Sequence, residues 1–179
     1  MDILRKHLAQ VVEGINLIDR GEYDGIVTAL KVVKESKGTV WLCGNGGSSS
    51  LCAHFANDLV KMGRIRAGSL VEAIPLMTAY GNDDGWRYMF VKQLAMRMEP
   101  TDMVFGISCS GNSDNVVKAL EWAYERKWLT AVLTGCSEDS EVNKVSDVVL
   151  HTRGVPDIRV QEDLHTIICH TIARELCEG

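Results

Sequence analysis

The sequence predicts an α/β fold, with a central parallel five-stranded sheet that carries helices on both faces, two helices before it and a long C-terminal helix. Two observations predict this class. Short apolar runs alternate along the chain with longer stretches in which apolar residues recur at helical spacing. In addition, two loops rich in glycine and serine each follow an apolar run and open onto an amphipathic stretch. Strand, turn and helix in that order are typical of parallel sheets covered on both faces.

The first two helices are predicted at Leu4–Ile18 and Tyr23–Val33, where apolar residues recur at helical spacing. A β-rich apolar run predicts the first strand at Thr39–Cys43. The pattern that follows the first glycine loop predicts a helix over Ser48–Met62, with Ser48 as its N-cap.

The remaining elements continue this alternation. Further strands are predicted at the apolar runs Leu70–Ile74, Met103–Ile107, Ala131–Leu133 and Val148–Leu150. Further helices are predicted at Gly85–Met98, Asn115–Lys127 and Asp157–Glu178. No linker, repeat or low-complexity tract interrupts the pattern. We therefore expect a single domain over residues 1–179, with a helical pair at 1–36 and the α/β core and C-terminal helix at 37–179.

Composition and charge argue against several classes of protein. The 179 residues are 46% hydrophobic and 24% charged, which is ordinary for a globular chain. The net charge of −5 and the lack of a long basic run argue against a nucleic-acid partner. We find no apolar signal core and no uncharged apolar window of about eighteen residues, so we expect a cytoplasmic protein with no membrane partner. The six cysteines lack C-x-x-C spacing and are expected to be reduced core thiols.

The two glycine and serine loops, Gly44–Ser50 and Gly106–Ser113, are candidate phosphate-binding loops. Glycine lets the backbone approach an anion, the first N–H groups of a helix point at it, and serine hydroxyls complete its coordination. Both loops fall at carboxyl ends of strands, where parallel sheets bind ligands. Neither loop is a dinucleotide fingerprint or a P-loop, which favours a phosphate monoester over a nucleotide. The alternative is that the serines are ordinary turn and capping residues.

The pairing of the two motifs resembles the sugar isomerase (SIS) domain. The motifs are Gly44-Asn45-Gly46-Gly47-Ser48 and Gly106-Ile107-Ser108-Cys109-Ser110-Gly111-Asn112-Ser113. Within that superfamily the chain is similar to the phosphoheptose isomerases, because His54 follows the first loop and Gly81-Asn82-Asp83 precedes an aromatic helix. The match extends over nearly the whole chain.

The resemblance implies an aldose–ketose isomerase that converts sedoheptulose 7-phosphate to D-glycero-D-manno-heptose 7-phosphate through a metal-assisted enediol. It implies one zinc ion per subunit and a homotetramer whose sites lie between subunits. The opposing hypothesis is a non-catalytic SIS module, either a sugar-phosphate sensor or a tetrameric protein-binding adaptor. An isomerase acting on another phosphosugar is a third.

His54 and Asp58 are four residues apart on a predicted helix, so both side chains lie on one face and can share a metal ion. Histidine together with a carboxylate suits zinc, and the alternative is an exposed polar pair. The family has a glutamate, both metal ligand and presumed base, where this chain has Asp58. Because aspartate is one methylene shorter, Glu162 is a second candidate for the base.

The predicted C-terminal helix carries further candidate ligands. At about 100° per residue, Glu162 and His170 lie about 80° apart around the helix, whereas Gln161 and His170 lie about 180° apart. In the family a glutamine eight residues before the final histidine shares the metal site. By its spacing from His170, Glu162 occupies the position of this glutamine. By residue type Gln161 matches it, so Gln161 remains the alternative. For His165 and His170 the alternative is a buried core histidine.

The expected site residues follow from these motifs and the resemblance. Asp58, His170 and Glu162 are expected to be catalytic. The zinc ligands are expected to be His54, Asp58, Glu162 and His170. Substrate binding is expected from Asn45, Gly46, Gly47, Asn82, Asp83, Ser108, Cys109, Ser110, Ser113 and Gln161. The expected partners are a phosphorylated ketose or aldose and further copies of the chain.

Overall fold

The computed structural model describes residues 2–135 and 138–178. Within these residues the strands are β1 (Thr39–Gly44), β2 (Arg66–Ser69), β3 (Met103–Ser108), β4 (Leu129–Thr134) and β5 (Val148–His151). They form one sheet in the order β2-β1-β3-β4-β5, and every neighbouring pair is parallel. This confirms the predicted parallel five-stranded sheet.

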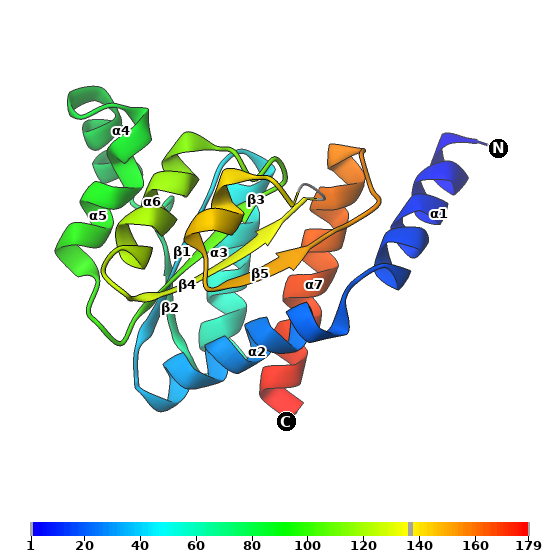
Figure 1. Cartoon of the computed structure of the whole chain (residues 1–179), viewed down its shortest axis with the longest axis horizontal. Coiled ribbons are helices and arrows are strands. Elements are labelled where there is room, and N and C mark those ends of the chain that lie inside the picture. Colours follow the sequence, from blue (N-terminus) through cyan, green and yellow to red (C-terminus); the bar gives the residue numbers. More distant parts are fainter. Residues whose placement is uncertain (1, 136–137, 179) are drawn as a thin grey trace.

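The helices cover both faces of this sheet (Figure 1). They are α1 (Ile3–Asn16), α2 (Arg20–Glu35), α3 (Gly47–Lys61), α4 (Ile74–Asp83), α5 (Met89–Arg97), α6 (Asp114–Tyr124) and α7 (Ile158–Glu178), with short 3-10 helices at Trp86–Tyr88 and Glu141–Val145. α2, α3 and α7 pack on one face, and α5 and α6 pack on the other. Among the described residues no helix is long and apolar enough to cross a membrane.

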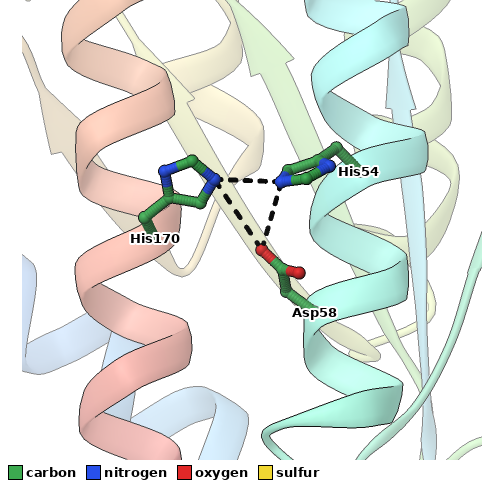
Figure 2. A group of neighbouring side chains, drawn as sticks. All are labelled: His54, Asp58 and His170. Atoms are coloured by element: carbon green, nitrogen blue, oxygen red, sulfur yellow. Dashed lines mark hydrogen bonds and ion pairs between the residues drawn. The ribbon is translucent and has the colours of Figure 1, made fainter.

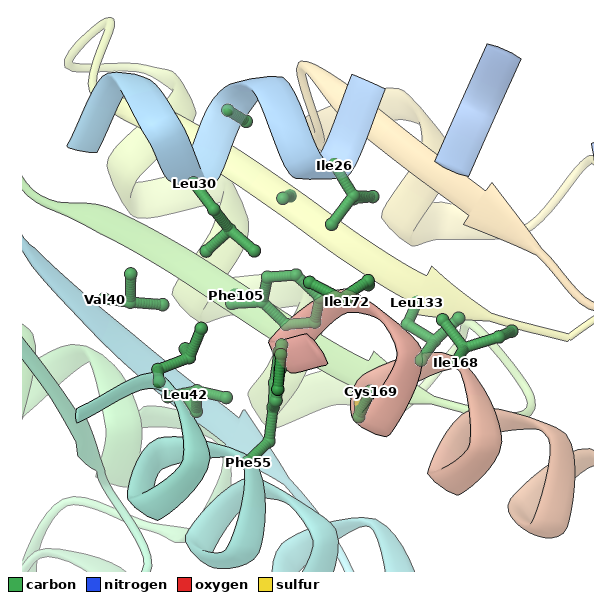
Figure 3. Packing of buried hydrophobic residues seen from close by; sticks show 14 of the residues in the cluster. Ile26, Leu30, Val40, Leu42, Phe55, Phe105, Leu133, Ile168, Cys169 and Ile172 are labelled. Carbon is green, nitrogen blue, oxygen red and sulfur yellow. The ribbon is translucent and has the colours of Figure 1, made fainter. Parts of the chain in front are cut away.

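The central strand β3 shows why the sheet is buried on both faces. Phe105 and Ile107 belong to the apolar cluster of α2, α3 and α7, whereas Val104 belongs to the cluster of α5 and α6. All six residues of β3 are buried. Phe55 on α3 meets Phe105 edge to face, with ring centroids 5.6 Å apart (Figure 3). This contact fixes α3 against the sheet.

One predicted strand was wrong. The apolar run Leu70–Ile74 is not a strand: β2 lies before it, at Arg66–Ser69, and Ile74 begins α4. β2 is an edge strand of mixed polarity with only one buried residue, so its sequence lacks the apolar signal of the other strands. Leu70 extends the pairing by one hydrogen bond, from its N–H to the carbonyl of Leu42 (2.9 Å), before the chain turns.

The predicted N-cap of α3 was also wrong. Gly46, and not Ser48, is the N-cap, and Ser48 lies inside the first turn. Gly46 has φ of +54°, a conformation that favours glycine, and it lets the helix start two residues earlier than the serine signal suggests.

The cysteines are free thiols over the described part of the chain. Cys43, Cys52 and Cys169 are buried, as expected for core thiols, while Cys109 is half-buried and Cys177 is exposed. Burial raises the pKa of Cys43 to about 12, so its thiol stays protonated. Cys136 lies outside the described residues.

Candidate functional site

The two glycine and serine loops meet at the carboxyl edge of the sheet. β1 and β3 are neighbours, so the loops that follow them are adjacent. A pocket of about 270 Å³ lies between them, lined by residues 45–48 of the first loop, by 107–110 and Ser113 of the second, and by Ile158 and Glu162 of α7. The structure thus brings together the predicted residues of both loops.

Two helix N-termini face this pocket. Gly46 and Ser113 are the N-caps of α3 and α6, and neither makes a side-chain capping bond. The first N–H groups of both helices are therefore available to a bound anion. The hydroxyls of Ser108 and Ser113 lie 3.3 Å apart beside them. No lysine or arginine is among the described residues that line the pocket. Its donors are neutral hydroxyls and amides.

The side chain of Asn45 is hydrogen-bonded to the second loop's helix, and its contact with substrate stays a prediction. Its side-chain Nδ2 donates to Oδ1 of Asn115 (2.8 Å), and Nδ2 of Asn115 donates back to Oδ1 of Asn45 (2.9 Å). Oδ1 of Asn115 also accepts from the N–H of Val116 (3.0 Å). The Asn45 amide therefore joins the two loops to each other. Sequence reasoning missed Asn115, because it reads as an ordinary polar residue in a helix.

A second hollow of about 240 Å³ continues from the pocket between α3 and α7. It is lined by Gly47, Ser48 and Leu51 of α3 and by 162–163 and 165–166 of α7. Leu51 and Thr166 were not predicted. Residues 162, 166 and 170 follow one another every four positions, so they form one stripe of α7 that runs along this hollow toward His170.

His54, Asp58 and His170 form a cluster at the far end of that stripe (Figure 2). The two Nε2 atoms of the histidines are 2.9 Å apart, and Oδ2 of Asp58 is 3.5 Å from His54 Nε2 and 3.9 Å from His170 Nε2. Both imidazoles are half-exposed, whereas the Asp58 side chain is only 11% exposed. The predicted juxtaposition of these three residues is confirmed.

The donor set and its geometry fit a zinc ion. Zinc bonds of about 2.0–2.1 Å in a tetrahedron separate neighbouring donor atoms by about 3.3 Å. The three distances in the cluster, 2.9, 3.5 and 3.9 Å, lie on either side of that value. Three protein donors leave a fourth position open, as in catalytic zinc sites.

Glu162 does not lie with these three residues. It precedes His170 by eight residues, which is about 12 Å of helical rise. Its Oε1 lies 2.6 Å from the point where a side chain at Gly47 would begin, so Glu162 faces the first turn of α3. The structure therefore does not support Glu162 as a fourth ligand. Glu162 and His170 point from neighbouring faces of α7, but they lie at different positions along the helix axis.

Gln161 and His165 face the protein interior. Nε2 of Gln161 donates to the carbonyl of Val155 (2.5 Å), away from the cluster, which agrees with the angular argument against it as a metal ligand. His165 is buried, and desolvation lowers its pKa to about 4. The buried core alternative thus describes His165, while half-exposed His170 belongs to the cluster.

Asn82 and Asp83 lie away from the loops. They occupy the exposed last turn of α4, where Asn82 Nδ2 donates to Asp83 Oδ1 (2.8 Å). Neither residue lines the two hollows described above. Within one chain they do not reach the pocket between the two loops, and their predicted contact with sugar hydroxyls stays a prediction.

The Asn45–Asn115 pair gives a first testable outcome. Replacing Asn115 by leucine leaves the Asn45 amide without its partner, and we expect a loss of about 1–3 kcal/mol of unfolding free energy. Urea denaturation measures it. The control, Asn82→Leu, changes an exposed asparagine and should alter stability by less than about 0.5 kcal/mol. Equal stability of both variants would show that the pair does not hold the loops.

The cluster of three predicts zinc binding. We expect His170→Ala to lower zinc affinity by more than about 100-fold, since even outer-shell partners of a metal change affinity by about 10–100-fold. Competition with a chromophoric chelator measures this affinity. His7→Ala removes another histidine outside the cluster and should leave zinc affinity unchanged. Wild-type affinity in His170→Ala would rule out the cluster as the zinc site.

Comparison with known proteins agrees with the geometry. Residues 8–135 match the model of the SIS domain family. The chain is 36% identical over 143 residues to a phosphoheptose isomerase of Helicobacter pylori, covering 77% of this chain and 73% of that protein. It is 33% identical over 184 residues to the phosphoheptose isomerase of Vibrio vulnificus, covering 96% and 94%. The solved structure of phosphoheptose isomerase GmhA from Neisseria gonorrhoeae superposes with a TM-score of 0.87 at 26% identity, covering 97% of this chain and 94% of that one. The chain therefore belongs to the SIS domain family and, within it, to the phosphoheptose isomerases, which are phosphosugar isomerases.

Proposed function

We propose that the chain isomerises sedoheptulose 7-phosphate to D-glycero-D-manno-heptose 7-phosphate through an enediol. The observation that carries the proposal is that the same two helices, α3 and α7, carry both the phosphate pocket and the cluster of His54, Asp58 and His170, and that a hollow lined as far as Leu51 and Thr166 lies on the path between them. Gly47 and His54 are separated by seven residues of α3, or about 10 Å of helical rise. An extended seven-carbon sugar phosphate is long enough to span that path with its carbonyl end at the cluster.

The phosphate end of the substrate is assigned to the second loop. The hydroxyls of Ser108, Ser110 and Ser113 surround the pocket together with the N-termini of α3 and α6. Neutral donors and helix dipoles bind a phosphate monoester without a fixed cation. Such a site suits a group that must bind and leave in every turnover.

The carbonyl end is assigned to the cluster. A zinc ion bound by His54, Asp58 and His170 would polarise the substrate carbonyl and stabilise negative charge on its oxygen. Asp58 Oδ1 is near the Asn57 amide (3.2 Å), while Oδ2 faces both imidazoles. The carboxylate is therefore held at the base of an open cluster, where it can meet the carbon next to the carbonyl.

The proton transfers follow from that placement. Asp58 takes a proton from C1 of the ketose, the freed electron pair forms the C1–C2 double bond, and the C2 oxygen gains a proton. Asp58 then returns its proton to C2 while the C1 hydroxyl loses its own, which leaves the aldehyde at C1. The proton that the C1 hydroxyl loses balances the one that the C2 oxygen gains, and because the cluster is half-exposed, water can carry protons to and from these two oxygens while His170 holds its place in the cluster. Glu162 lies at the pocket end of the path, opposite Gly47 and about 12 Å of helical rise from His170, which favours a contact with the substrate away from its carbonyl over the role of base.

The test is turnover of sedoheptulose 7-phosphate by the zinc-loaded protein. We expect aldose formation, and we expect Asp58→Asn to lower kcat by about 10²–10⁴-fold, because general base catalysis contributes that much. Asp24→Asn, on the exposed surface of α2, is the matched control and should keep wild-type turnover. Wild-type turnover by Asp58→Asn would refute the assignment of the base. Binding of the sugar phosphate without turnover by the wild type would instead identify a sensor.

We further propose that the chain assembles as a homotetramer with sites completed between subunits. α1 exposes an apolar stripe, with Leu4, Leu8 and Val12 at 67%, 54% and 59% exposure. A second copy that covers this stripe would bury apolar area that a lone chain leaves in water. Asn82 and Asp83, which do not reach the pocket of their own chain, are available to a neighbouring one.

The assembly is tested by light scattering coupled to size-exclusion chromatography. We expect a tetramer for the wild type and smaller species for Leu8→Asp combined with Val12→Asp, because charge on the stripe opposes its burial. Lys6→Asp places a carboxylate on the same helix without removing apolar surface and should remain tetrameric. A monomeric wild type would contradict the proposal.

A further inference from the structure

A buried histidine, His165, contacts the second loop on the side away from the pocket. Cys109 lies between the phosphate-pocket residues Ser108 and Ser110, and its Sγ is 3.8 Å from Nδ1 of His165 on α7. The carbonyl of Cys109 accepts from the N–H of Gly135 (3.1 Å), at the end of β4. The Cys109 side chain thus reaches back from the loop toward α7, while its backbone is bonded to the sheet.

The bonding around His165 allows one tautomer. Nε2 lies 3.3 Å from the carbonyl oxygen of Thr134, which can only accept a hydrogen bond. It also lies 3.4 Å from Oγ1 of Thr152, whose own hydrogen points to that same carbonyl (3.1 Å). Nε2 must therefore carry the ring hydrogen and share it between these two oxygens.

The Cys109 thiol is then the donor to Nδ1. Burial keeps the imidazole neutral, with its pKa lowered to about 4, so Nδ1 presents a lone pair. Burial also raises the pKa of the Cys109 thiol to about 11, with the charge of Glu162 adding to the effect, so the sulfur keeps its hydrogen near neutral pH. The protonated Cys109 thiol can therefore donate to neutral His165 Nδ1 over the physiological pH range.

We propose that His165 is a positioning residue of the phosphate pocket, which fixes the Ser108–Ser110 segment through the Cys109 thiol and ties it to the ends of β4 and β5. The inference rests on the proposed role of the second loop in phosphate binding. His165 touches neither the phosphate nor the reacting carbons. Its effect is to hold the hydroxyls of Ser108 and Ser110 where the phosphate oxygens will be, since a loop that is already ordered loses less entropy on binding.

Two replacements of His165 test the roles of its two ring nitrogens separately. Asparagine retains an acceptor near the place of Nδ1, toward Cys109, whereas glutamine retains a donor near the place of Nε2, toward Thr134. We expect His165→Gln to raise the Kd for inorganic phosphate, measured by calorimetry, and the KM for the sugar phosphate by about three- to tenfold, the scale of one hydrogen bond. His165→Asn should stay within about twofold of the wild type.

The Cys109 side gives a test that does not require changing the core histidine. Cys109→Ala also removes the hydrogen bond of this thiol with the Ser48 side chain, so it should weaken phosphate binding at least as much as His165→Gln does. The double variant should weaken it no further than Cys109→Ala alone, because both changes break the same bond between the thiol and the imidazole. Cys109→Ser retains a donor and should bind phosphate as the wild type does. His7→Gln, on exposed α1, is the matched histidine control and should leave Kd unchanged.

The outcomes separate this inference from the proposed function. The positioning role would be overturned if His165→Asn and His165→Gln lost the same phosphate affinity in proportion to their melting temperatures. It would also be overturned if the losses of phosphate affinity added up in the double variant. Neither result would affect turnover by the wild type. A wild type that binds no phosphate and shows no turnover would overturn both. We expect that only His165→Gln, Cys109→Ala and their double variant lose phosphate affinity, and that kcat is unchanged in all of the variants.

Discussion

The parallel pairing of β1 with β3 is the constraint on which the rest of the structure depends. From β1 the chain passes through α3 to β2 on one side, and it then returns through α4 and α5 to β3 on the other side of β1. At such a switch point the loops after the two central strands diverge to opposite faces and leave a hollow between them. The phosphate pocket is this hollow. The reciprocal amides of Asn45 and Asn115 join the two loops that border it.

The contact between α3 and α7 extends the site away from the switch point. Phe55 and Cys52 of α3 pack with Ile168, Cys169 and Ile172 of α7 in one cluster (Figure 3). Because these buried faces fix the two helices side by side, their outer faces bring the side chains of His54, Asp58 and His170 together, with facing atoms 2.9, 3.5 and 3.9 Å apart. Packing on one side of each helix thus determines the geometry of the three-residue cluster on the other.

Much of the fold could be predicted from the sequence, because buried strands and amphipathic helices leave distinct periodic patterns. The edge strand β2 could not, since it pairs on one side only and its four residues, from exposed Arg66 to buried Ser69, include no large apolar side chain. His54 and Asp58 were predictable because a helix puts residues four apart on one face. The position of Glu162 was not, because the angle around α7 says nothing of which part of α3 lies opposite. Asn115 was missed because its role depends on a partner 70 residues away.

The reciprocal amide pair also bears on the chemical ageing of the chain. Asn45 is followed by Gly46, whose lack of a side chain least obstructs attack of its own nitrogen on the asparagine amide, the reaction that deamidates asparagine. In the folded chain both polar atoms of the Asn45 side chain are engaged by Asn115, so the attack requires this side chain to rotate out of its hydrogen bonds. Conversion to aspartate would set a carboxylate oxygen against the Oδ1 acceptor of Asn115. Folding therefore protects an asparagine whose conversion to aspartate would weaken the bridge between the two loops.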